Sequence, residues 1–278
     1  MDGAGSPPES SDLLVCTDVD GTLIRGCRAA PAGTVVVDRY TDGRVAVTPD
    51  RTGPSLMELA RTATWCVVTT RTAEQFSRLL LPTPAWALVA NGLVLLRNGH
   101  PVPAWESTMR RLLSAASEPT DEVNRRLRPL HRAIGCRERN VERAFLVWSG
   151  PEATAPETVD EAAQLVAGHG WHVVVSGGKL YILPECLDKA AAVAHLASHL
   201  QTQRIVAAGD SPLDLTLLLE ADAAIMPADA VLMTRPLSHD LVSRAGTRIQ
   251  RTQRLGLEAV EDILNWILAQ ARDGRRFS

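Results

Sequence analysis

The chain has 278 residues, which is enough for one large domain or two modest ones. Its apolar share of 45% is ample for a hydrophobic core, and its net charge of −3 gives no reason to expect nucleic acid or an anionic membrane as a partner. No apolar run in the sequence is long enough for a membrane span.

Residues 1–11 are rich in glycine, proline and serine, and they lack the basic start and apolar core of a signal peptide. We therefore expect a disordered tail there. The cysteines are odd in number, scattered and without CxxC spacing, which favours reduced thiols over a disulfide framework or a zinc site. Together these features predict a cytoplasmic protein.

The first strong pattern is an apolar run that starts at Leu13 and leads to Asp18 and Asp20. The run predicts a buried parallel strand, and Gly21 allows a sharp turn just after it. Two carboxylates this close repel each other unless a cation or a shared proton relieves them, and Mg²⁺ is the natural cation. The alternative is a solvated acidic turn. A calcium loop is rejected because its twelfth position, Ala29, is not a glutamate.

Two β-rich runs, 34–38 and 44–48, flank an Asp-Gly pair and predict a hairpin. Because this hairpin follows the first strand directly, it would form either a flap over the site or a surface excursion without a role. Ser55 is expected to cap a helix over residues 56–62.

A second buried strand is predicted over residues 65–71. It ends in Thr69, Thr70 and Arg71, and Thr72 is expected to cap the helix that follows. A threonine hydroxyl at a strand end can donate to a phosphate oxygen. Arg71 would face either a substrate or the solvent.

A third strand is predicted over residues 86–90, and Asn91-Gly92 follows it. Asn-Gly is also a common plain turn, so this pair does not by itself indicate a site. Another short hairpin is expected next, with Asn98-Gly99 as its turn.

The middle of the chain predicts a mixed α/β segment that is inserted as a cap domain over residues 93–186. Its expected helices and strands are 107–117, 121–134, 145–148, 159–168, 171–176 and 180–183. The helices are rich in arginine, which would either draw an anionic substrate toward the cleft or form a solvated face. These arginines are Arg110, Arg111, Arg125, Arg126, Arg128 and Arg132.

Lys189 is one of only two lysines in an arginine-rich chain, and it stands at a predicted helix start. A cation is less favourable there because of the helix dipole, so a nearby anion would explain its place better than a free surface lysine does. A buried strand over 204–208 then leads through a glycine to Asp210. Ser211 is expected to cap the next helix, which brings Asp214 about one turn after Asp210.

The rest of the sequence predicts further elements of the same α/β core. A short strand is expected over residues 223–226 and an amphipathic helix over 255–271, with a frayed arginine-rich end over 272–278.

Four of these patterns, in this order, resemble the motifs of the haloacid dehalogenase (HAD) superfamily of phosphohydrolases. Asp18-x-Asp20-Gly21-Thr22-Leu23 is similar to the first motif, Thr69 to the second, Lys189 to the third and Gly209-Asp210-Ser211-x-x-Asp214 to the fourth. Within the superfamily, Ala90-Asn91-Gly92 resembles the Cof-like branch. The stretch 176–184 before Asp188-Lys189 resembles the sucrose-phosphate phosphatase branch. Two positions depart from the pattern: Thr70 and Ala190 replace glycines.

The resemblance implies a doubly wound parallel sheet built from residues 12–92 and 187–278, with a C2-type α/β cap over 93–186. It implies that Asp18 is the nucleophile and Asp20 the general acid and base, assisted by Thr69 and Lys189. The implied Mg²⁺ ligands are Asp18, Asp210, the main chain of Asp20 and, as a ligand or an orienting group, Asp214. The implied substrate contacts are Thr69, Thr70, Arg71, Asn91 and Lys189.

The same likeness favours a small-molecule substrate, a phosphorylated sugar or polyol, which is hydrolysed through an aspartyl-phosphate. Two alternatives use the same motifs. A phosphomutase or phosphotransferase would pass the phosphoryl group to an organic acceptor, and a regulatory protein would bind a phosphate ligand without turnover.

Overall fold

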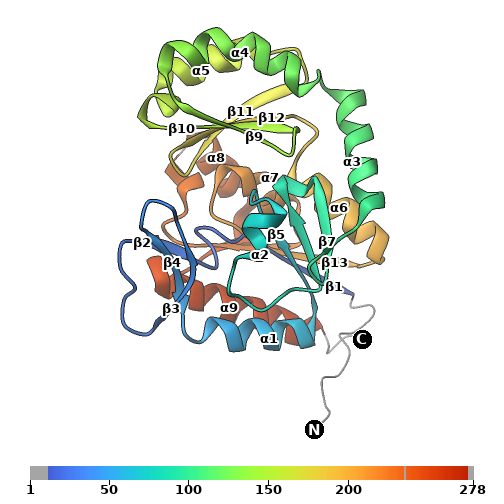
Figure 1. Ribbon diagram of the computed structural model, residues 1–278. Coiled ribbons are helices and arrows are strands. Elements are labelled where there is room, and N and C mark those ends of the chain that lie inside the picture. The colour runs from blue at the N-terminus through green and yellow to red at the C-terminus, as the bar shows by residue number, and fades with distance from the viewer. Residues whose placement is uncertain (1–11, 235, 275–278) are drawn as a thin grey trace.

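The computed structural model describes residues 12–234 and 236–274 (Figure 1). The expected tail over residues 1–11 and the last four residues of the expected frayed end lie outside these ranges. Within the described residues, eight strands form a large sheet in the order β15-β14-β13-β1-β5-β6-β7-β8. The strands from β15 to β6 are parallel. This is the doubly wound α/β sheet that the sequence predicts.

The parallel strands are short and almost entirely buried, which explains their continuous apolar character. Their bounds are β1 (Leu13–Thr17), β5 (Thr64–Val68), β6 (Trp86–Val89), β13 (Arg204–Ala208), β14 (Ala223–Met226) and β15 (Ile249–Arg251).

The order of the strands creates a switch point between β1 and β13. From β1 the chain moves through β5 to β6 in one direction, and from β13 it moves through β14 to β15 in the other. Because such crossovers are right-handed, their helices cover opposite faces of the sheet. Ligands bind beyond the carboxyl ends of strands at such a point.

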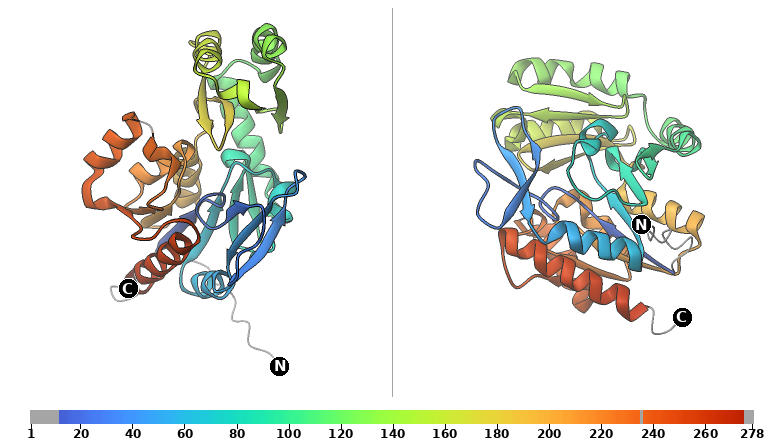
Figure 2. Two further views of the ribbon diagram at one scale, coloured as in Figure 1. Left: turned by 90° about the vertical axis from the view of Figure 1, so that its left-hand side faces the viewer. Right: turned by 60° about the horizontal axis from the view of Figure 1, so that its bottom comes forward.

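Helices pack on both sides of the sheet. α1 and α9 pack against each other and against β5 and β1, while α7 packs on β13 and β14 and contacts α6 and α8 (Figures 1 and 2). The helices of the core are α1 (Thr52–Thr62), α2 (Ala73–Ser77), α6 (Lys189–Leu200), α7 (Leu215–Glu220), α8 (Pro236–Ala245) and α9 (Gly256–Gly274). No helix in the described part of the chain is both long and apolar enough to cross a membrane.

A small antiparallel sheet, which we call the flap, stands between β1 and α1. It consists of β2 (Arg25–Cys27), β4 (Val45–Pro49) and β3 (Thr34–Arg39), paired in that order. The predicted hairpin is therefore confirmed. The helix after it begins at Thr52, so Ser55 lies inside the helix and the expected cap there is wrong.

The cap lies over the core, and its antiparallel sheet has the order β11-β12-β10-β9 (Figure 1). Its strands are β9 (Arg137–Val141), β10 (Phe145–Ser149), β11 (Trp171–Ser176) and β12 (Lys179–Pro184), and its helices are α3 (Pro103–Ala116), α4 (Thr120–Ile134) and α5 (Pro156–Val166). β9 is absent from the sequence-based prediction because its residues are mostly polar and exposed.

The expected start of the cap at residue 93 is too early. β7 (Val94–Arg97) and β8 (His100–Pro101) pair antiparallel at the edge of the large sheet. They therefore extend the core, and α3 begins just after them, at Pro103.

Candidate active site

The site begins where three neighbouring strands end. Asp18 follows β1 directly, Thr69 follows β5, and Asp210 comes two residues after β13. The main-chain N–H of Asp18 donates to the carbonyl oxygen of Ala208 at 2.9 Å, which fixes Asp18 beside the turn that carries Asp210. The topology of the sheet thus gathers side chains that are far apart in the sequence.

Lys189 lies in the middle of this acidic group. Its Nζ atom donates to Oδ1 of Asp18 at 2.7 Å and also to Oδ1 of Asp214. The lysine is 1% exposed, so its charge is compensated by buried partners rather than by water. Asp188 caps the helix by accepting from the main-chain N–H groups of Ala190 and Ala191, which leaves Lys189 in the first turn of α6 and directed at the carboxylates.

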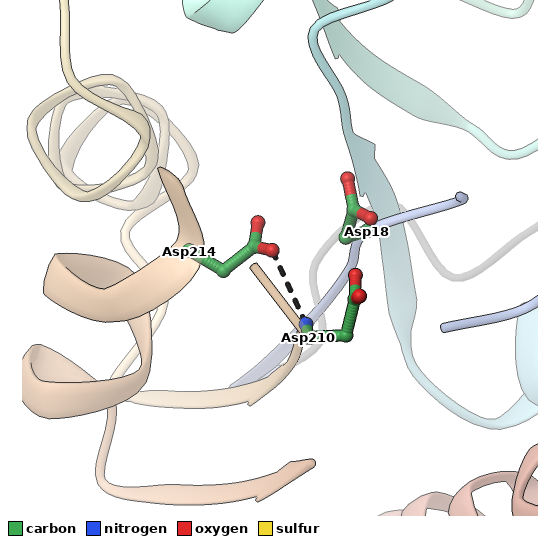
Figure 3. Close-up of side chains that lie close together, drawn as sticks. All are labelled: Asp18, Asp210 and Asp214. Atoms are coloured by element: carbon green, nitrogen blue, oxygen red, sulfur yellow. Dashed lines mark hydrogen bonds between the residues drawn. The ribbon is translucent and has the colours of Figure 1, made fainter. Parts of the chain in front are cut away.

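Asp214 is fully engaged by protein groups. While Oδ1 accepts from Lys189, Oδ2 accepts from Ser211 through both its main-chain N–H (2.9 Å) and its hydroxyl (2.8 Å), and from the N–H of Asp210 (3.2 Å; Figure 3). The Ser211 hydroxyl caps the short helical turn that follows, as the sequence predicts. Asp214 therefore orients both the lysine and the loop of Asp210.

Asp18, Asp210 and Asp214 form a buried carboxylate cluster in which one oxygen atom from each residue lies within 4.8 Å of the other two, an arrangement that can hold a metal ion (Figure 3). The Oδ1 atom of Asp210 is buried and has no hydrogen-bond partner among the described residues, as expected of an oxygen that can bind a cation. Gly21 makes this arrangement possible, because a Cβ atom at that position would lie 2.3 Å from Oδ2 of Asp210. Carboxylate oxygens are the donors that Mg²⁺ prefers.

The charges in this cluster are strongly coupled. Burial, followed by the charge of Asp214, raises the pKa of Asp18 to about 7, although Lys189 acts in the opposite direction. Burial and the charge of Asp18 raise the pKa of Asp210 to about 8. Burial lowers the pKa of Lys189, but Asp18 and Asp214 more than offset this and hold it above its ordinary value. A divalent cation would relieve the crowded carboxylates.

Asp20 points away from this cluster and toward Arg71. The guanidinium binds both oxygens of Asp20, at 2.7 and 2.8 Å, and also Oδ2 of Asp38 on the flap at 2.6 Å. The hydroxyl of Tyr40, also from the flap, donates to Oδ1 of Asp20 at 3.3 Å. Arg71 is thus neither a surface residue nor free to bind substrate with its whole guanidinium. It joins the loop after β1 to the flap.

The other predicted contacts divide into two groups. Thr70, Arg71 and Lys189 line a cavity of about 630 Å³ that also contains Asp18, Asp20 and Asp210. Thr69 is buried behind its wall, where its hydroxyl accepts from the N–H of Arg71 at 3.2 Å.

Asn91, like Thr69, is not among the residues that line the cavity. Its Nδ2 atom donates to the carbonyl oxygen of Leu187 at 2.7 Å, two residues before Lys189. Its main chain is left-handed, with φ 59°, and asparagine tolerates this conformation well. This geometry supports a role in holding the start of α6 rather than in touching substrate.

One known protein family matches most of this chain. The sequence model of the sucrose-6F-phosphate phosphohydrolase family matches residues 11–248. The chain belongs to this family. A comparison with curated protein sequences finds no significant match.

Solved structures share the family's fold. The sucrose-phosphatase from Synechocystis sp. PCC6803, solved with sucrose and phosphate, is 17% identical with a TM-score of 0.59, over 92% of this chain and 98% of that one. A Thermoplasma acidophilum protein is 16% identical with a TM-score of 0.61, over 91% and 97%. A HAD-superfamily phosphatase from Bacteroides thetaiotaomicron is 13% identical with a TM-score of 0.59, over 97% and 99%. This member of the sucrose-6F-phosphate phosphohydrolase family is therefore a HAD-type phosphatase with a C2-type cap.

Sequence reasoning missed the residues that this family member brings to the cavity from outside the motifs. Asp38 and Tyr40 come from the flap, and Arg139, Lys179 and Tyr181 come from the cap sheet. One signal was available, because Asp38 follows three consecutive valines in its strand, and a buried acid needs a partner. The identity of that partner, Arg71, depends on the packing of the flap.

Proposed function

We propose that the protein hydrolyses a phosphorylated sugar or polyol in a Mg²⁺-dependent reaction that passes through an aspartyl-phosphate at Asp18. The observation that carries this proposal is the buried Lys189 ammonium, held between Asp18 and Asp214 beside an Asp210 oxygen without a partner. The family description and the Synechocystis complex with sucrose and phosphate support a sugar phosphate as the substrate.

The metal would be held by Asp18, Asp210 and the main-chain carbonyl of Asp20. Asp214 would act through Lys189 and the Asp210 loop, because both of its oxygens are already engaged. A bound Mg²⁺ would neutralise charge on the phosphoryl oxygens.

In the first step, a carboxylate oxygen of Asp18 attacks phosphorus while the bond from phosphorus to the sugar oxygen breaks. Asp20 donates a proton to that leaving oxygen, for which it must loosen its contact with Arg71, since a carboxyl group that carries a proton cannot accept fully at both oxygens. In the second step, Asp20 takes a proton from a water molecule whose oxygen attacks phosphorus. The bond to Asp18 breaks, and inorganic phosphate leaves.

The surrounding residues supply the electrostatic environment for both steps. Lys189 touches the nucleophile and stabilises the negative charge that develops beside it. Thr70 and Arg71 stand at the cavity surface, where hydroxyl and guanidinium donors can reach phosphoryl oxygens. The cap sheet and the flap line the other sides of the cavity, and their closer approach on substrate binding would limit the entry of bulk water.

Phosphate release from a panel of phosphorylated sugars, polyols, nucleotides and p-nitrophenyl phosphate tests the proposal, with Mg²⁺ and with EDTA. We expect metal-dependent release with a preference for sugar or polyol phosphates. Asp18→Asn should abolish release, whereas Asp222→Asn, a matched change at an exposed aspartate remote from the cavity, should not. Wild-type turnover by Asp18→Asn, or full activity in EDTA, would overturn the proposal.

A further inference from the structure

The wall that the cap sheet gives to the cavity carries two cationic side chains, Arg139 on β9 and Lys179 on β12. Val147 on β10 pairs with both Arg139 and Tyr181, and Lys179 is two residues before Tyr181. Since side chains alternate along a strand, Arg139, Lys179 and Tyr181 project from the same face of the sheet. All three line the cavity, so this face looks toward the core.

These two cations differ from the others around the cavity because they lack acidic partners. Arg139 and Lys179 have no carboxylate within 4.0 Å among the residues that the structure describes. The paired cations and their acids are Arg25 with Asp229, Arg44 with Asp42, Arg71 with Asp20 and Asp38, Arg78 with Glu74, and Lys189 with Asp18 and Asp214.

The balance of charge points the same way. Of the seven lysine and arginine residues that line the cavity, five have acidic partners, so only Arg139 and Lys179 lack one among the described residues. A phosphomonoester dianion and one divalent metal cancel each other, so binding them leaves these two cations without an anion. Partial burial and the charge of Arg139 lower the pKa of Lys179. An anion bound beside the Lys179 ammonium would oppose both effects and stabilise its charge.

We assign the transferring phosphoryl group to a different part of the cavity. It must reach Asp18 and Lys189 at the carboxyl edge of the core sheet, whereas Arg139 and Lys179 belong to the cap sheet that lies over this edge (Figure 1). A cavity of about 630 Å³ has room for a substrate that spans both walls.

We propose that the preferred substrate is a phosphorylated sugar derivative with a second anionic group at the end remote from the transferring phosphoryl, and that Arg139 and Lys179 bind this group. The inference rests on the proposed function and narrows its substrate class. It departs from a neutral sugar such as the sucrose in the family's description, which carries no second anion.

The test compares substrates that differ only at the remote end. Gluconate 6-phosphate and glucitol 6-phosphate have the same carbon chain, and only the first carries a carboxylate. Fructose 1,6-bisphosphate and fructose 6-phosphate form a second pair, which tests whether a phosphate rather than a carboxylate is the second anionic group. We expect kcat/KM to favour the doubly anionic member of at least one pair by about 10-fold or more, as for a charge-assisted hydrogen bond.

The variant with both Arg139→Ala and Lys179→Ala should lose this preference while hydrolysing glucitol 6-phosphate and p-nitrophenyl phosphate as the wild type does. Arg137→Ala is the matched control, because Arg137 lies two residues before Arg139 on β9 but does not line the cavity. It should retain the preference. Equal hydrolysis within both pairs by the wild type, or a preference that survives the double substitution, would overturn the inference.

A binding measurement separates this inference from the proposed function. Calorimetry with the Asp18→Asn variant compares the same pairs of compounds without turnover. Tighter binding of the doubly anionic member supports the inference even if the wild type releases no phosphate, which would count against the proposed function alone. Equal or absent binding of both members contradicts the inference.

Discussion

Arg71 binds both oxygens of Asp20, at 2.7 and 2.8 Å, and so ties the loop after the nucleophile strand to the flap. The same guanidinium reaches Asp38 on β3, which is 8% exposed. A bidentate contact of this kind fixes direction as well as distance, because the planar guanidinium matches the carboxylate. The orientation of the Asp20 carboxylate therefore depends on the flap, which lies outside the four motifs.

Arg71→Lys tests this dependence, because a lysine keeps the charge but cannot bind two carboxylates in a fixed plane. We expect kcat to fall by about 10- to 100-fold with KM little changed, since a small displacement of a catalytic group is costly. Steady-state kinetics on the best substrate measure this, with Arg78→Lys as the control on the same cavity wall. Equal kcat values for Arg71→Lys and the wild type would contradict the role of the contact.

Gly21→Ala should disturb the metal site directly. The new Cβ would lie 2.3 Å from Oδ2 of Asp210 and would displace that carboxylate. Gly43→Ala is a matched control, because Gly43 has nearly the same φ (84° against 85°) but no atom within 4 Å of its Cβ position.

Both glycine variants should lose about 1 kcal/mol of stability from backbone strain. Only Gly21→Ala should need a higher Mg²⁺ concentration for half-maximal activity, as read from a metal titration. The same metal requirement in both variants would show that steric contact with Asp210 is unimportant.

Lys189→Met should destabilise the fold as well as abolish turnover. It removes the cation between two buried carboxylates, and breaking a buried ion pair in this way costs about 3–5 kcal/mol. Urea unfolding at pH 8 in EDTA measures the loss. Lys179→Met, at the only other lysine, should change the free energy of unfolding little, because Lys179 lines the cavity and forms no ion pair within the described residues. Equal stability of the two variants would argue against the buried pair.

The metal-free protein should lose stability as the pH rises. The pKa values of Asp18 and Asp210 are raised from an ordinary 3.8 to about 7 and about 8 in the folded protein, so the folded state holds more protons than the unfolded state across the intervening window. Stability therefore falls with rising pH through this window. In EDTA, Asp210→Asn should narrow the fall in Tm between pH 5.5 and 8.5, and Mg²⁺ should raise the wild-type Tm most at pH 8.5. An identical pH dependence of both proteins in EDTA would contradict the shift for Asp210.

Much of the core could be predicted from the sequence because its signals are local. Apolar runs identify the parallel strands, and Thr72 and Ser211 cap the turns that follow two of them. The rule of crossover handedness then gives the face of the sheet that each connecting helix covers, whereas the strand order is seen only in the structure. The partners of Arg71 could not be predicted in this way, because they depend on how a flap far away in the sequence packs. β9 was missed for a related reason: its polar residues form an edge strand that only the neighbouring β10 reveals.

The chain crosses between core and cap at two places, and the return crossing is anchored. Asn91 binds the carbonyl oxygen of Leu187, and Gly92 packs so close to α6 that a Cβ there would lie 2.5 Å from the side chain of Ala192. Lys189 is therefore fixed to the core rather than to the cap. A change of sequence between the two crossings can therefore alter the cap wall of the cavity without displacing Lys189 from the core.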